Sequence, residues 1–195
     1  MPNEPQIPAA LSFDGLGGDA RAAIAIAAAG RYSGVAIATN HPQLLPAELS
    51  GSARRHFRKI LESHQLHLAS LRVAVPRSSF ADPATIDRTV DHARTAIALA
   101  ADLGVTTITL NTGPLDGSKV RQDTILAATR ELAELATHAG ITLALAGAGA
   151  GKIHEVLSEL RCQMVRANFL PRQSVEAGED PLTAAGLLAG QIGQL

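Results

Sequence analysis

Polar side chains that could hold a small ligand follow several of the strands predicted from the sequence. The carboxyl ends of parallel strands meet at one end of an α/β sheet, so we expect these side chains to lie near one another. Their groups are neutral or basic, which suits an anionic or sugar-like ligand, and they lack the carboxylate pair that proton transfer at carbon requires. The candidate ligand-binding residues are Asn40, His41, Asn111, Asn168 and Arg172.

A glycine-rich turn at residues 15–20 (Gly-Leu-Gly-Gly-Asp-Ala) follows the first predicted strand and precedes a helix. It matches the G-x-G-x-x-G/A pattern, in which a pyrophosphate approaches a helix N-terminus. That pattern also needs an acidic residue after the second strand, where residues 39–41 are Thr-Asn-His. A flexible turn with Asp19 as the helix cap explains the glycines equally well.

A second glycine-rich stretch at residues 147–152 resembles a phosphate-binding loop at first sight. The Walker pattern requires an earlier glycine and a hydroxyl after the lysine, and Ala146 and Ile153 occupy those positions. We therefore interpret it as a flexible loop between a strand and a helix. The single cysteine, Cys162, has no activating partner in the sequence, and no zinc-binding spacing or serine-nucleophile motif is present.

The elements that must position these residues alternate regularly along the chain. Each unit is a short apolar run, a loop, an amphipathic helix and a glycine, which is typical of a parallel sheet with helical crossovers. Six strands are predicted, at residues 11–13, 35–38, 66–75, 105–110, 141–145 and 163–168, and the last predicted helix spans residues 181–192.

We expect one domain over residues 1–195: an incomplete TIM-type β/α barrel with about six βα units, or alternatively an open doubly wound parallel sheet. A closed barrel of this type has eight strands and typically about 250 residues. Six units would leave strands one and six as exposed edges. We expect the N-terminal segment through Pro8 or a second subunit to cover one of them.

Composition excludes several classes of protein. The chain has 46% hydrophobic and 18% charged residues and a formal net charge of −1, which argues against a nucleic-acid partner. No apolar stretch is long enough for a membrane span, and the first residues lack the basic start of a signal peptide. We therefore expect a cytoplasmic protein.

Several short sequence segments, taken in order along the chain, resemble the sugar phosphate isomerase/epimerase family, the xylose-isomerase-like TIM barrels. Each segment lies at a predicted junction between a strand and a helix. They are residues 30–35, 99–105, 132–144, 168–171 and 177–181.

The resemblance implies a divalent metal such as Mn, Mg or Zn at the carboxyl end of the barrel, held mainly by acidic residues with a histidine. It places the family's strand-five glutamate at Ala146, the aspartate after strand six at Leu170, and an acidic residue of strand two near Ala36. The remaining ligands would lie beyond Leu195. Alanine and leucine offer no ligand atoms, so we expect no metal and no cofactor here.

Three functional hypotheses follow. The first is a degenerate family member, a pseudoenzyme, that binds a small molecule or a partner. The second is an active metal-dependent sugar isomerase or epimerase in a homo-oligomer, whose neighbouring subunit supplies acids such as Asp14, Asp116 or Glu176. The third is a nucleotide-cofactor-binding open α/β domain that uses residues 15–20.

Overall fold

The computed structural model describes residues 9–75, 80, 82, 84–113, 119–147 and 149–194. Seven parallel strands form one sheet in the order β1-β2-β3-β4-β5-β6-β7, so every strand lies beside its neighbours in the sequence. The strands are β1 (Ala10–Ser12), β2 (Gly34–Ala38), β3 (His67–Arg72), β4 (Thr107–Asn111), β5 (Thr142–Ala146), β6 (Val165–Asn168) and β7 (Ile192–Gln194).

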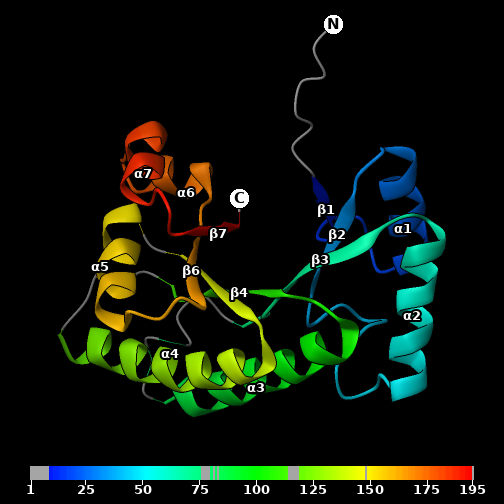
Figure 1. The fold of residues 1–195 in the computed structure, drawn as a ribbon, viewed down its shortest axis with the longest axis horizontal. Helices are drawn as coiled ribbons and strands as arrows, with labels where there is room; N and C mark the ends of the chain where they lie inside the picture. The colour runs from blue at the N-terminus through cyan, green and yellow to red at the C-terminus, as the bar shows by residue number, and fades with distance from the viewer. Residues whose placement is uncertain are drawn as a thin grey trace, which may run out of the picture.

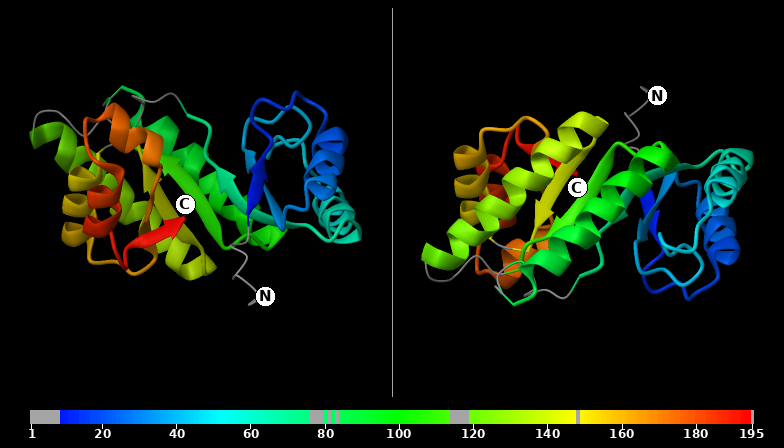
Figure 2. Two further views of the ribbon diagram at one scale, coloured as in Figure 1. Left: turned by 90° about the horizontal axis from the view of Figure 1, so that it is seen from above. Right: turned by 90° about the horizontal axis from the view of Figure 1, so that it is seen from below.

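The helices lie on the outer side of the curved sheet, with α1 and α2 beside β1–β3 and α5–α7 beside β5–β7 (Figures 1 and 2). They are α1 (Ala20–Ala29), α2 (Gly51–Ser63), α3 (Ile86–Leu103), α4 (Lys119–Ala139), α5 (Ala150–Leu160), α6 (Pro171–Glu176) and α7 (Pro181–Leu187). No helix in the described ranges is long and apolar enough to cross a membrane.

The sequential strand order confirms the incomplete TIM-type barrel. A doubly wound sheet reverses its strand order at a switch point, and this sheet has no reversal, so the open-sheet alternative is wrong. The prediction of six strands and of a helix reaching residue 192 also needs correction. Helix α7 ends at Leu187, a turn with Gly190 at φ 77° follows, and β7 comes next.

The edges of the described sheet are therefore β1 and β7, rather than strands one and six. The three residues of β7, with a glycine at the centre, carry no alternation of apolar and polar residues that could have predicted a strand. The expectation that residues through Pro8 cover an edge falls outside the described residues.

The hydrophobic core lies between the outer face of the sheet and the helices. Alternate strand residues point into it, as period-two pleating requires: Ile108 and Leu110 of β4, and Leu143 and Leu145 of β5, are each at most 1% exposed. Helices α1, α3 and α4 face the sheet partly with alanines, which lets their backbones approach closely. The other residues of each strand consequently point into the barrel interior.

Two β-bulges change which residues point inward. Between β2 and β3, Val35 aligns with Leu68 and Ala36 with Ser70, so Ala69 is an extra residue. Between β6 and β7, Ala167 aligns with Ile192 and Asn168 with Gln194, so Gly193 is an extra residue. A bulge shifts the following side chain to the other face of the sheet, here into the interior.

The two bulged strands meet across the barrel. The side-chain amide of Gln194 donates from Nε2 to Ser70 Oγ at 3.0 Å, joining residues 124 positions apart in the sequence. Ser70 is 2% exposed. This hydrogen bond connects edge strand β7 to β3 through the interior, since β7 pairs only with β6 in the sheet.

The bulge in β7 depends on the absence of a side chain at position 193. A Cβ there would lie 2.6 Å from Cβ of Arg166. We expect Gly193→Ala to lower the free energy of unfolding by about 1–3 kcal/mol, because one strand must move. Urea unfolding measures this change. Gly186→Ala is the matched control: a Cβ at this α7 position meets nothing within 4 Å, so stability should stay equal or rise; equal effects of both variants would contradict the role of Gly193.

Candidate functional site

One layer of side chains surrounds the interior at the carboxyl end of strands β4 to β7. Asn111 aligns with Ala146 across β4 and β5, and Asn168 aligns with Gln194 across β6 and β7. Leu145 aligns with Ala167, which brings the following residues, Ala146 and Asn168, to the same level. The layer therefore consists of three carboxamides and an alanine, which we call the carboxamide layer (Asn111, Ala146, Asn168, Gln194).

Two oxygens of this layer are buried without a partner among the described residues. They are Asn168 Oδ1 and Gln194 Oε1. A buried acceptor without a hydrogen bond costs roughly 1–3 kcal/mol, so folded proteins rarely leave one unused. The two residues are neighbours across β6 and β7, so both unpartnered acceptors belong to the same part of the layer.

The third amide of the layer has a fixed orientation. Asn111 Oδ1 accepts from the backbone N–H of Gly113 at 2.9 Å. It also lies against Gly147, where a Cβ would be only 2.1 Å from Oδ1. Gly147 has φ 107°, a conformation that favours glycine. The glycine is therefore required where β5 ends, both for its backbone angle and for the close approach of Asn111.

An ion pair and a buried histidine lie on the opposite side of the interior, at the carboxyl ends of β1 to β3. The guanidinium of Arg72 donates to Asp14 Oδ2 from Nη2 at 2.7 Å and from Nε at 3.1 Å. His41 is 7% exposed and its ring lies 5.8 Å from that of Phe13, centre to centre. Its Nδ1 accepts from Gln43 N at 3.3 Å, and its buried Nε2 has no partner in the described structure.

The predicted ligand-binding residues therefore lie in different surroundings. Asn111 and Asn168 share the carboxamide layer, and His41 is buried at the end of β2. Asn40 is exposed beside it. Arg172 lies on α6 with 87% of its side chain exposed and donates from Nε to Glu176 at 2.7 Å. The role of these five residues in binding stays a prediction.

Three acidic residues were considered as metal ligands that a neighbouring subunit could supply. Two of them form ion pairs within the chain, and the third is outside the described residues. Asp14 is paired with Arg72, and Glu176 with Arg172. Asp116 lies outside the described residues. No group of three or more His, Cys, Asp and Glu that could hold a metal occurs among the residues with described positions.

The positions assigned to the family's ligands do not fit a metal centre. Ala146 is buried in the carboxamide layer, and Leu170 is 36% exposed at the start of α6. Neutral amide oxygens are weaker ligands for Mg²⁺ or Mn²⁺ than the carboxylates that such ions prefer.

Both glycine-rich stretches are capped by the chain's own side chains. At α1, Asp19 Oδ1 accepts from Arg21 N at 3.0 Å, and Gln43 Oε1 accepts from Ala20 N at 2.9 Å. At α5, Glu179 Oε2 accepts from Ala150 N at 2.8 Å. These acceptors occupy the backbone donors that a phosphate would otherwise use.

Sequence reasoning missed Gln194, Ser70 and Glu179. Gln194 and Ser70 reach the interior only because of bulges, which leave no periodic signal in the sequence. Glu179 was noted only as part of a sequence segment that resembles the family. Its contact with α5 joins residues 29 positions apart.

The buried imidazole generates a prediction about pH. Burial lowers the pKa of His41 below 6.5, and the nearby Asp14 carboxylate opposes that shift. The unfolded chain therefore binds a proton more readily than the folded protein, so this residue's contribution to stability is lost as the pH falls below its ordinary pKa. We expect wild type to lose more unfolding free energy than His41→Gln when urea unfolding is compared at about pH 7.5 and about pH 5. His64→Gln, at an exposed position, should behave as wild type; identical pH dependence of wild type and His41→Gln would contradict the assignment.

Solved structures with the same fold include sugar-modifying enzymes. A xylose isomerase domain protein from Planctomyces limnophilus has a TM-score of 0.76 and 18% identity, covering 94% of this chain and 70% of its own. D-allulose 3-epimerase from Methylomonas sp., in complex with D-allulose, has a TM-score of 0.73 and 18% identity, covering 89% and 64%. A xylose isomerase-like TIM barrel protein from Mycobacterium smegmatis, in complex with magnesium, has a TM-score of 0.68 and 18% identity, covering 95% and 72%.

At 18% sequence identity, these similarities show a shared fold alone. This chain spans between 64% and 72% of the length of those three proteins. No functionally curated protein sequence matches it. The family model of the xylose isomerase-like TIM barrel matches residues 24–154, from within α1 to within α5. With more than half of its length matched, and with the strand order of that barrel, this chain belongs to the xylose isomerase-like TIM barrel family.

Proposed function

We propose that this protein is a degenerate member of its family that binds a small polyhydroxylated, sugar-like molecule at the carboxamide layer, without metal-dependent isomerisation. The observation that carries the proposal is the pair of buried, unpartnered oxygens of Asn168 and Gln194. Sugar hydroxyl groups are donors that would satisfy both oxygens. Neutral amides that give and accept hydrogen bonds are well suited to a ligand with many hydroxyl groups.

The surroundings of the layer support binding more than proton transfer at carbon. Such transfer needs a general base within hydrogen-bond reach of the substrate. Asp14 is held by two hydrogen bonds from Arg72, and Glu179 caps helix α5. Ala146 stands where the family resemblance implies a glutamate.

The alternative is an active metal-dependent sugar isomerase or epimerase whose site a second copy completes. The observations that favour it are the D-allulose 3-epimerase among the similar structures and the magnesium bound in another of these structures. A homo-oligomer is also a means of covering the edges β1 and β7, which have no further strand beside them in the described sheet.

Titration calorimetry with D-allulose, D-fructose and D-xylose tests the proposal, first in EDTA and then with added Mn²⁺. We expect saturable binding of at least one sugar in EDTA, and no interconversion of the sugars by chromatography. Asn168→Leu removes one acceptor but keeps the Gln194–Ser70 hydrogen bond, so it should weaken binding by about tenfold or more without unfolding the protein.

Gln163→Leu is the matched control, because Gln163 is an exposed amide that precedes β6 and lies outside the layer. It should bind as wild type. Binding and sugar conversion that both require Mn²⁺ would replace the proposal with the enzyme alternative. Absence of binding to all three sugars in both conditions, or undiminished binding by Asn168→Leu, would show that the carboxamide layer is not a sugar site.

A further inference from the structure

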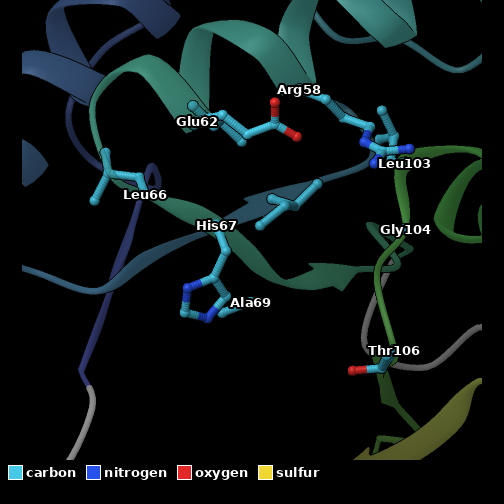
Figure 3. Close-up of a pocket in the computed structure, with 10 residues that line it drawn as sticks. Arg58, Glu62, Leu66, His67, Ala69, Leu103, Gly104 and Thr106 are labelled. Carbon is cyan, nitrogen blue, oxygen red and sulfur yellow. The ribbon is translucent and has the colours of Figure 1, made fainter.

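A second pocket lies at the other end of the barrel, independent of the proposed sugar site. It has a volume of about 400 Å³ and lies where α2 ends, β3 begins, and α3 passes into β4. Figure 3 shows Arg58 and Glu62 on one side of this pocket, His67 below them, and Thr106 across the gap. Chemistry in barrels of this type is placed at the carboxyl ends of the strands, so the location sets this pocket apart from the family's site.

The pocket exists because β3 and β4 separate toward their N-terminal ends. They pair only at Leu71 with Ile108 and at Arg72 with Thr109, whereas β4 and β5 pair along five residues each. The bulge at Ala69 bends β3 at the point where pairing with β4 stops. The same irregularity that turns Ser70 into the interior therefore opens the sheet below it.

Apolar side chains form the inner part of the pocket. Leu61, Leu66 and Leu103 are each at most 6% exposed, and Leu68 and Ala69 are half-buried. This wall can accept an aliphatic group of a ligand, which gains roughly 25 cal/mol for each Å² of apolar surface removed from water.

Two side chains of opposite charge lie at the rim of the pocket. Arg58 and Glu62 are four residues apart on α2, so they share one face of the helix. Neither side chain makes an ion pair or a hydrogen bond with any residue in the described ranges, although the side chain of Arg54, one turn earlier, pairs with Asp102. The guanidinium carbon of Arg58 lies 3.7 Å from the position that a Cβ on Gly104 would take, which places the cation over the end of α3.

We propose that this pocket binds an aliphatic α-amino acid in its zwitterionic form. Arg58 takes the carboxylate, for which a guanidinium has matching geometry, and Glu62 takes the ammonium group. The side chain of the ligand lies on Leu68 and Leu103. A simple anion would be repelled by Glu62 and a simple cation by Arg58, whereas a zwitterion satisfies both, and the volume is within the usual range for small-molecule sites.

L-leucine is the probe, titrated into the full chain in EDTA and followed by calorimetry. We expect saturable binding, weakened by about tenfold or more in Arg58→Gln. Arg55→Gln is the matched control, because Arg55 is exposed on the same helix and does not line the pocket. Both positions are on the surface, so both variants should fold as judged by circular dichroism.

A second comparison tests the role of Glu62. Wild type should bind L-leucine more tightly than 4-methylpentanoate, which lacks the ammonium group, and Glu62→Gln should remove most of that difference. Absence of saturable L-leucine binding, or equal binding by Arg58→Gln and wild type, would overturn the proposal. Asn168→Leu should bind L-leucine normally, so the outcome is distinct from that of the sugar experiment.

Discussion

The position of edge strand β7 in the described barrel depends on the hydrogen bond from Gln194 to Ser70. A sheet of seven strands has two edges, and β7 is held by only two aligned residue pairs with β6. The Gln194 amide ties this short strand to β3 through the interior at 3.0 Å. It can do so only because a bulge precedes each partner, at Gly193 and at Ala69, and turns both side chains inward.

That arrangement also determines the chemistry at the mouth of the barrel. Once Gln194 faces inward, it joins Asn111 and Asn168 in a layer without formal charge. Two side-chain oxygens of this layer are buried and have no hydrogen-bond partner among the described residues. The charged groups nearby are committed elsewhere, since Arg72 holds Asp14 and Glu179 caps α5. This neutral, hydrogen-bonding layer is the basis of the proposal that the protein binds hydroxyl groups without metal-assisted isomerisation.

The bulge at Ala69 has consequences at both ends of the same strand. Above it, Ser70 and Arg72 point into the interior, where one braces β7 and the other pairs with Asp14. Below it, β3 departs from β4 and leaves the pocket lined by Arg58 and Glu62. One extra residue in one strand thus shapes the candidate sugar site and the proposed amino-acid site together.

The sequence by itself indicated the alternation of strands and helices and the family, and it left an incomplete barrel and an open doubly wound sheet as alternatives. It placed Ala146 and Leu170 where the family resemblance implies acidic ligands. These properties depend on local periodicity, on capping residues such as Asp19, and on short sequence segments that are contiguous in the chain. Asn111 and Asn168 were candidates from the sequence alone, because Asn168 ends a predicted strand and Asn111 directly follows one. Only the tertiary structure decided that Arg172 faces solvent, that Gln194 belongs to the layer, and that Glu179 closes the loop before α5. The last two depend on bulges and on contacts between residues 29 and 124 positions apart, which no local pattern encodes.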